Sequence, residues 1–333
     1  MPPTTRSGQL LLADLYVFRG DVGTVLVMDV NSDVTGLRAE PGFHPGARYE
    51  FQLHFDRAGR QSLTYRVTFG DADGRGRQPL DLHVLTCDHA GDGEPGELVL
   101  SGRTGEPVTA NGIRLWAGRV GDPFYVDLAL LSMVTSAVAR GIAPDLAAWD
   151  PADAQNSFSG TTVESIVIEI PDSGPLLRPG ARTGVWGATR LAAGADGWRL
   201  ADRVGHPMMG SIFRSGDAGR PDPADHGHPS RDVAEEAGRL AGAVAAVTAA
   251  AGTVGDPRAY GAAVARELLP DMLPYVVGMP ATFGFAARNG RALADNVPEV
   301  MLSLVTGTAV PTGLTPGVSG HLRRGRFPYL VPA

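Results

Sequence analysis

The stretch Tyr49-Glu50-Phe51-Gln52-Leu53-His54-Phe55 alternates strictly between apolar and polar side chains. Leu63-Thr64-Tyr65-Arg66-Val67-Thr68-Phe69 repeats this alternation shortly afterwards. A period of two is typical of a β-strand with one buried face, whose other face is wet or lines a cavity. The residues between the two runs, Arg57 to Arg60, favour a tight hairpin turn. The pair therefore predicts an antiparallel sheet.

Outside this hairpin, shorter runs predict further strands through the first two thirds of the chain. They lie at Leu10–Phe18, Thr24–Val30, Leu80–Thr86, Glu97–Leu100, Val163–Ile170, Thr183–Arg190, Trp198–Asp202 and Met208–Phe213. Between them, Asp127 to Arg140 is expected to be a helix, and residues 141–160 a loop or lid.

After residue 214 the pattern becomes helical. A polar surface loop at 215–230 precedes a helix capped by Ser230. Its expected apolar face is Val233, Ala237, Leu240, Val244 and Val247. Asp256-Pro257 opens a second helix, with the apolar face Tyr260, Val264 and Leu268. Asn296 to Glu299 has the form of a capping box that opens a third helix through Leu304.

These patterns predict a mainly β protein, either a twisted β-sandwich or a partly open barrel, with C-terminal helices packed against it. We expect a β-rich body at residues 1–213 and a loop and helical section at residues 214–333, packed together as one structural unit. No linker in the sequence is long enough to require freely moving domains.

Composition narrows the range of functions. All 29 basic residues are Arg, so chemistry that needs a Lys nucleophile or Schiff base is excluded. The net charge of −7 and the lack of a basic run argue against nucleic-acid binding. Cys87 is the single cysteine, which excludes an internal disulfide. No apolar run is long enough to span a membrane, and the first residues lack the core of an export signal. We therefore expect a cytoplasmic protein.

The stretch from Leu115 to Leu128 holds the densest set of chemically distinct side chains, around a turn imposed by glycines and Pro123. If Tyr125 and Asp127 lie on a strand, they share a face, and burial of that face would suit them for acid–base catalysis. The alternative is a structural hydrogen bond to an arginine. The turn residue Asp122 has the same two interpretations, catalyst or turn cap.

A second group, at the end of the predicted strand Trp198–Asp202 and just after it, consists of Asp202, Arg203 and His206. Within this group, His206 is the preferred titrating residue. The candidate catalytic residues are Asp122, Tyr125, Asp127, Asp202 and His206, and the candidate substrate-binding residues are Trp116, Arg119, Arg203 and Arg291. We expect the two groups to face each other across one pocket, because unpaired buried charge is costly. Otherwise, Leu115 to Leu128 is a structural seam between sheet and helices.

The sequence patterns that would indicate a metal site or a catalytic nucleophile are weak. Asp71 to Gly74 has only the start of a calcium loop. His226 and His228 lie near Asp222 and Asp225, but in a polar loop without support. Cys87 and His89 could share a strand face, although a buried core thiol is the simpler interpretation. Neither a nucleophile elbow nor a phosphate loop is present. We expect no metal and no organic cofactor.

Several motifs resemble the bacterial family catalogued as domain of unknown function 4331. They include Asp14 to Phe18, Val25 to Asn31, the hairpin at Tyr49 and Tyr65, Ala117 to Leu128, Val167 to Pro171, Gly184 to Trp186, Asp202 to Pro207, Asn289 to Asp295 and Phe327 to Leu330. The chain departs from that family in lacking its usual opening Ser-His segment and export signal, in having Gly210 where an Asn is usual, and in its less acidic hairpin. The resemblance implies a fold and no settled activity.

For function, we expect a cofactor-independent enzyme of small-molecule, secondary metabolism that uses acid–base residues in an apolar pocket, such as a cyclase, lyase, isomerase or hydrolase. The alternatives are a non-catalytic protein that binds an apolar small molecule and a structural module. The expected partner is a small molecule, without nucleic acid or membrane, and the sequence leaves room for a homo-oligomer.

Overall fold

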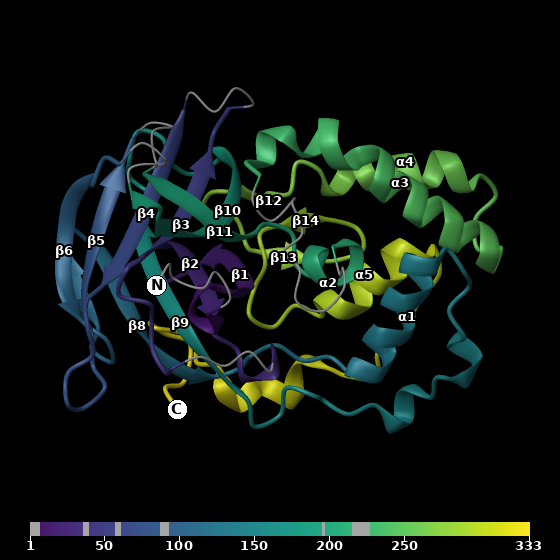
Figure 1. Cartoon of the computed structure of the whole chain (residues 1–333), viewed down its shortest axis with the longest axis horizontal. Coiled ribbons are helices and arrows are strands. Elements are labelled where there is room, and N and C mark those ends of the chain that lie inside the picture. The colour runs from purple at the N-terminus through teal and green to yellow at the C-terminus, as the bar shows by residue number, and fades with distance from the viewer. Residues whose placement is uncertain (1–6, 36–39, 57–60, 87–92, 195–196, 215–226) are drawn as a thin grey trace.

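The computed structural model describes residues 7–35, 40–56, 61–86, 93–194, 197–214 and 227–333. Its strands lie together at one side of the molecule and its helices at the other (Figure 1). The expected hairpin turn at Arg57 to Arg60 lies outside the described residues.

The first sheet contains five antiparallel strands. In spatial order they are β1 (Leu12–Arg19), β2 (Gly23–Val30), β9 (Thr162–Pro171), β8 (Ile113–Gly121) and β7 (Val108–Ala110). Because β1 lies at the edge of the sheet, one side of it is open to other parts of the chain.

The second sheet is also antiparallel. In order it contains β11 (Trp198–Val204), β10 (Arg182–Ala192), β3 (Ala47–His54), β4 (Ser62–Phe69), β5 (Pro79–Leu85) and β6 (Glu97–Arg103), with β12 (Leu273–Val276) also paired to β10. A short ribbon, β13 (Thr282–Phe283) with β14 (Arg288–Asn289), stands apart.

The core lies between the two main sheets. Apolar side chains of the first sheet, such as Leu26 and Ile168, form one buried cluster with Phe51 and Val67 of the second. In the described residues the sheets remain open at their edges, so the sandwich prediction is confirmed and the barrel alternative is not needed.

The polar face of β3 is not exposed to solvent. Glu50 is fully buried, because Arg66 (2.7 Å) and Arg190 (2.9 Å) form ion pairs with its carboxylate. Carbonyl oxygens of Glu94 and Pro95 in turn accept hydrogen bonds from Arg66. The alternating pattern predicted the strand correctly, but paired charges and a covering loop make both of its faces buried.

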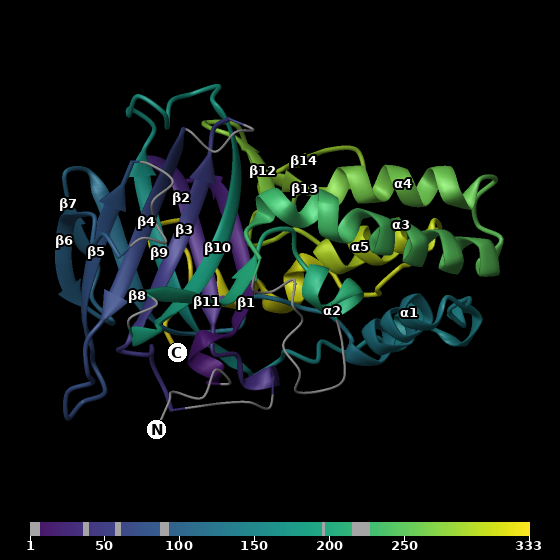
Figure 2. The same cartoon turned by 45° about the horizontal axis from the view of Figure 1, so that its top comes forward.

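Five helices gather at one end of the sandwich (Figures 1 and 2). They are α1 (Leu128–Arg140), α2 (Met209–Phe213), α3 (Asp232–Ala251), α4 (Pro257–Leu268) and α5 (Val297–Thr306). The helical layer is therefore assembled from both the middle and the end of the chain. Conversely, the chain after residue 214 returns to both sheets, through β12 and through a bridge from Pro332 to Val120.

Helix caps follow the sequence closely. Asp127 accepts a hydrogen bond from the backbone of Ala129 and caps α1, and Asp256 does the same for α4. Asn296 and Glu299 form the expected capping box, with the Asn296 amide 2.9 Å from the Glu299 carboxylate.

Two expectations about helices were wrong. Met208 to Phe213 is helical rather than extended, because periodicity in so short an apolar run does not separate the two states. The buried face of α3 begins with Asp232 and Glu236, while Val233 is 56% exposed. Ser230 lies within a preceding turn, and Arg231 occupies the cap position of α3.

A buried ion network explains this reversal and joins the second sheet to the helices. Arg203 on β11 contacts Asp232 (2.7 Å) and Glu236 (3.2 Å) on α3. Arg214, just after α2, contacts Glu236 (3.1 Å) and Asp271 (2.8 Å). These partners offset the cost of removing the charges from water, so the buried face of α3 begins with the acids Asp232 and Glu236 instead of apolar residues.

No helix in the described part of the chain is long and apolar enough to cross a membrane.

Changing Glu236 to Gln should lower the free energy of unfolding by roughly 3–5 kcal/mol, because two buried arginines lose a shared carboxylate. The matched control is Glu235→Gln on the same helix, where an exposed pair with Arg231 is lost and a change below about 0.5 kcal/mol is expected. Urea unfolding measures both. Equal losses in the two variants would show that the network does not stabilise the fold.

Candidate functional site

The outer face of the first sheet, turned away from the core between the sheets, carries a row of acids. Leu15 and Val17 of β1 face the core, so Asp14, Tyr16 and Phe18 point outward. Asp14 is paired in register with Asp29 on β2, and Asp29 with Ser165 on β9. The Ser165 hydroxyl donates a hydrogen bond to Asp29.

Arg291 brings a positive charge to this row. Its backbone pairs with the open side of β1, donating to and accepting from Val17 at 2.9 and 3.1 Å. Its guanidinium turns over the strand, forms an ion pair with Asp14 and lies 4.1 Å from the centre of the Tyr16 ring. One residue thus both covers the sheet edge and supplies the cation.

Asp122 reaches the same place from the end of β8. Its carboxylate accepts hydrogen bonds from the backbone of Phe124 (3.0 Å) and the hydroxyl of Ser32 (3.3 Å). The Phe124 ring lies 5.5 Å from the Arg291 guanidinium. We call Asp14, Tyr16, Asp29, Asp122 and Arg291 the acid cluster.

The carboxyl groups of the acid cluster titrate abnormally. Burial, followed by the charge of Asp14, raises the pKa of Asp122 to about 7. Burial and the charge of Asp122 raise the pKa of Asp29 well above its usual range, although the Ser165 hydrogen bond opposes this. Because one guanidinium serves three buried carboxyls, the protonated form of Asp29 is favoured more than in an exposed acid, and the pKa of Asp122 lies at about 7.

Several polar atoms in the acid cluster have no hydrogen-bond partner among the described residues, although they are buried. They are the Tyr16 hydroxyl, Oδ2 of Asp29 and Nε of Arg291. Buried polar atoms in folded proteins are nearly always paired, so three such atoms in one place call for a functional or ligand-based explanation. Together they could donate to, and accept from, a polar substrate.

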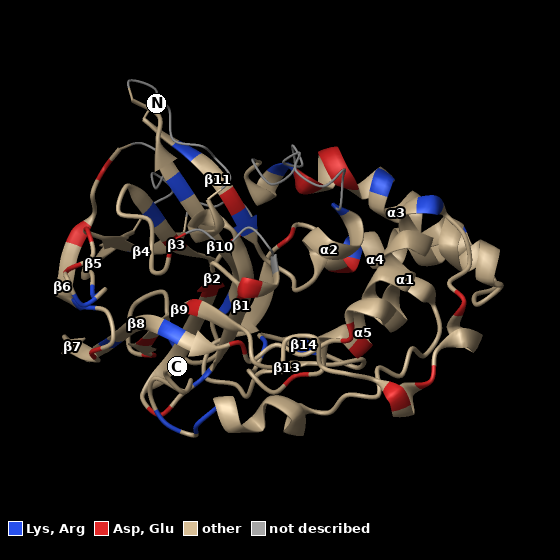
Figure 3. Cartoon of the chain, turned by 60° about the horizontal axis from the view of Figure 1, so that its bottom comes forward, with Lys and Arg blue, Asp and Glu red and all other residues tan. Residues whose placement is uncertain are grey.

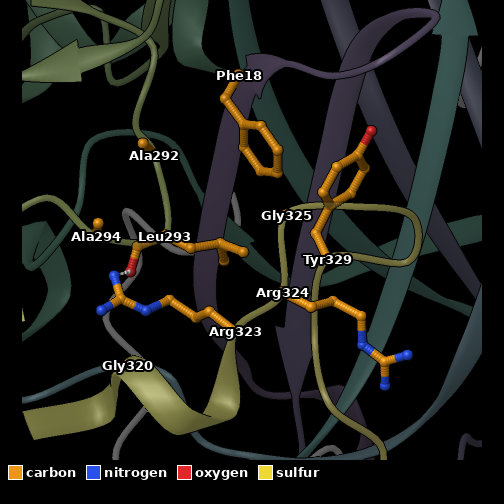
Figure 4. Close-up of a pocket in the computed structure, with 9 residues that line it drawn as sticks. All are labelled: Phe18, Ala292, Leu293, Ala294, Gly320, Arg323, Arg324, Gly325 and Tyr329. Atoms are coloured by element: carbon orange, nitrogen blue, oxygen red, sulfur yellow. Dashed lines mark hydrogen bonds between the residues drawn. The ribbon is translucent and has the colours of Figure 1, made fainter. Parts of the chain in front are cut away.

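Two cavities are lined by residues that lie next in sequence to members of the acid cluster. The larger, about 400 Å³, is lined by Phe18, Leu293, Arg323, Arg324 and Tyr329, with small residues at 292, 294, 320 and 325 (Figure 4). The smaller, about 230 Å³, borders Asp122 through Gly121 and Thr161. Leu293 belongs to the same apolar cluster as Tyr16, so it lies in the layer between the larger cavity and the acids.

Three other predicted site residues join the acid cluster or its surroundings. Arg291, proposed as substrate-binding, is a member. Tyr125 donates a hydrogen bond to the Ala294 carbonyl (3.2 Å), beside the larger cavity. Trp116 is buried in the same apolar layer as Tyr16.

Arg119 and Asp127 lie apart from the acid cluster. Arg119 forms an ion pair with Glu164 at 3.2 Å. Asp127 does not continue a strand with Tyr125, because the carboxylate is used as a helix cap and also accepts from the backbone of Gln155 (2.9 Å). These contacts give both residues a structural role.

A second group of predicted site residues lies away from the acid cluster and consists of Asp202, Arg203 and His206. Asp202 accepts from the backbone of Leu12 (2.8 Å), and Arg203 belongs to the ion network with α3. The His206 backbone donates to Asp271 (2.6 Å), and Nδ1 of its buried ring faces the same carboxylate at 3.6 Å. The candidates thus form two separate networks, where the sequence led us to expect one pocket.

The described residues contain no group of three or more His, Cys, Asp or Glu arranged to hold a metal ion. The Asp71 to Gly74 segment is a turn in which Asp73 accepts from the backbone of Arg75 and Arg77. His228 accepts a hydrogen bond from Ser230. His226, Asp222, Asp225, Cys87 and His89 lie outside the described residues.

Sequence reasoning missed Asp14, Tyr16 and Asp29 as site residues. A signal was present: Asp14 alternates with Tyr16 and Phe18, so one acid shares a strand face with two aromatic side chains. An acid at such a position is buried if the aromatics are, and buried acids are candidates for function.

No family model, no curated protein and no solved structure matches this chain.

Asp122→Asn should alter stability in a pH-dependent way. A raised folded-state pKa means that the carboxyl favours folding below its unfolded value of 3.8 and loses this contribution as pH rises through about 7. The amide oxygen can accept from the backbone of Phe124, the amide NH2 can donate to the hydroxyl oxygen of Ser32, and the group never ionises. The variant should therefore match the wild type near pH 4 and exceed it by roughly 2–4 kcal/mol near pH 8.5, as measured by urea unfolding. A difference that is constant with pH would contradict this.

Asp127→Ala should lower the free energy of unfolding by about 1–2 kcal/mol, because α1 loses its cap. Asp127→Asn should retain most of that stability, since an amide oxygen can also cap a helix. Thermal unfolding of both variants makes the comparison. If Asp127→Asn is as damaged as Asp127→Ala, the carboxylate charge, and not the cap, is what matters.

Proposed function

We propose that this protein is a cofactor-independent enzyme that performs acid–base chemistry on a small molecule at the acid cluster. The observation that carries the proposal is the burial of three carboxyls, Asp14, Asp29 and Asp122, around one guanidinium, a geometry that raises the pKa of Asp122 to about 7. A pKa near the working pH is what a general base needs. Cyclisation, elimination, isomerisation and hydrolysis all use such a proton transfer.

The acid cluster offers distinct roles. Asp122, as carboxylate, takes a proton from the substrate. The raised pKa of Asp29 favours its protonated form, in which it and the Tyr16 hydroxyl can donate hydrogen bonds to an oxygen on which negative charge develops. Arg291 stabilises that charge while paired with Asp14. Pairs of carboxyls with separated pKa values are a recurring pattern in acid–base enzymes.

Access to the acids requires a route through the apolar layer. The larger cavity supplies its outer part, and Leu293 separates this cavity from Tyr16. The Leu293 carbonyl is held by Arg323 at 3.1 Å. In this proposal, displacement of the Leu293 side chain admits the substrate and excludes water once it has entered.

A non-catalytic binding protein for an apolar small molecule is the second candidate, favoured by the aromatic floor of the same cavity. We also propose that the chain is a divergent member of the domain of unknown function 4331 family. This is supported by the position of three motifs quoted above, which come together at one place in the fold. They are the motifs that contain Asp14 to Phe18, Asp122 and Arg291. A cytoplasmic location stays a prediction that cell fractionation would check.

The first test is direct titration of Asp122 by carboxyl carbon NMR, with Asp122→Asn to assign the signal. The proposal expects an apparent pKa of about 7. A value near 4 would remove the base and overturn the proposal.

The second test looks for proton transfer. The protein is incubated in heavy water with a panel of small ketones and keto acids, and deuterium entering carbon is followed by mass spectrometry. Wild-type exchange should rise with pH around 7 and fall at least 100-fold in Asp122→Asn. Glu235→Gln, a surface change on α3, is the matched control. Saturable binding of panel members without any exchange would favour the binding protein.

A further inference from the structure

The larger cavity has an apolar floor built from distant parts of the chain. Phe18 is the last but one residue of β1, Leu293 lies two residues after Arg291, and Tyr329 comes from the C-terminal segment. The Phe18 and Tyr329 rings meet edge to face, with centres 5.3 Å apart. Figure 4 shows the two rings on one side of the cavity and the chain at Arg323 and Arg324 on the other, with the two guanidiniums turned in opposite directions.

The arginines of the cavity are not neutralised by acids. Arg323 donates to two carbonyl oxygens, of Leu293 and Pro316, and so keeps its full charge. Within the described residues, the side chain of Arg324 has neither a hydrogen bond nor an ion pair, although it is only partly exposed. Elsewhere in the molecule acidic and basic positions are interspersed (Figure 3). Two guanidiniums without carboxylate partners are therefore a local surplus of positive charge.

The backbone at Tyr329, which carries one of the two rings of the cavity floor, is held in an energetically unfavourable conformation. Tyr329 has φ of 68°, in the left-handed region that non-glycine residues rarely adopt. Its backbone is fixed by hydrogen bonds with Arg326 (2.7 Å) and Arg324 (2.8 Å), and its hydroxyl contacts Glu169 (3.1 Å). Strain that surrounding contacts enforce is typical of functional sites.

From these observations we infer that the larger cavity binds an aromatic or otherwise apolar carboxylate. The apolar body lies on Phe18, Leu293 and Tyr329, and the carboxylate pairs with the Arg324 guanidinium. A cavity of about 400 Å³ falls within the range of small-molecule sites. A fork of N–H donors matches a carboxylate in geometry as well as charge.

This inference deepens the proposed function and rests on it for one step, namely that the bound acid is the substrate. The cavity wall at Ala292 to Ala294 directly follows Arg291, and Phe18 lies two residues beyond Tyr16 on the same strand face. A carboxylate held at Arg324 leaves the apolar end of the molecule on Phe18 and Leu293, the cavity residues that lie nearest in the sequence to Tyr16 and Arg291. The site selects the charged end of its ligand and leaves chemistry to the other end.

The test uses naphthylacetate and its neutral counterpart naphthylacetamide, titrated into the full chain by isothermal calorimetry. Wild-type protein should bind the acid at least 10-fold more tightly than the amide, the size expected of one charge-assisted contact. Arg324→Gln should remove that preference and leave amide binding unchanged, which also shows that the cavity is intact.

The matched control is Arg326→Gln. Arg326 is an exposed arginine of the same loop that does not line the cavity, so both affinities should change less than about twofold. Equal binding of acid and amide, an equal loss in the two variants, or no saturable binding of the acid would each overturn the inference.

The Asp122→Asn variant separates the two proposals. It should bind naphthylacetate like the wild type, because the carboxylate contact lies at Arg324. If Asp122 titrates near 4 and the preference for the acid persists, the proposed enzyme fails and the carboxylate site stands. If proton exchange occurs and Arg324→Gln binds acid and amide like the wild type, the enzyme stands and the carboxylate site fails.

Discussion

Burying Arg291 between Asp14 and the ring of Tyr16 leaves Asp29 and Asp122 without a cation of their own. The unusual properties of the outer face of the first sheet follow from this shortage of positive charge. The pKa values of both acids are raised, and buried polar atoms have no hydrogen-bond partner among the described residues. The fold tolerates the cost because a large core between two sheets supplies stability elsewhere.

The ion network at α3 shows the opposite arrangement with the same residue types. Arg203, Arg214 and Arg239 there face Asp232, Glu236 and Asp271, so three positive charges meet three negative ones. Although burial alone would raise the pKa of Asp271, its contacts with His206 and Arg214 hold that pKa well below the usual range. Where positive and negative charges balance, each group keeps its ionised form. Such a network suits the contact between the second sheet and the helices. Unbalanced charges keep a proton available, and this is the physical basis for placing chemistry at the acid cluster.

The sequence predicted what depends on neighbouring residues. The alternation from Tyr49 to Phe55 specified a strand, and Asp127, Asp256 and Asn296 specified helix starts, because caps and strand faces are set within a few positions. It did not predict that Asp14 meets Arg291, since the two lie 277 positions apart. It also placed Val233 on the buried face of its helix, because an apolar pattern carries no information about the distant arginines that make the burial of Asp232 favourable.

The pairing of Arg291 with the outer side of β1 also bears on how the chain acquires its structure. Contacts between residues so far apart give a high contact order, and loop-closure entropy must be overcome before they form. On the ribosome, β1 is made early but keeps an unsatisfied edge until Arg291 emerges. The nascent chain therefore passes through a long stage with an exposed strand, which makes it a natural client for chaperones and prone to intermolecular pairing if synthesis stalls.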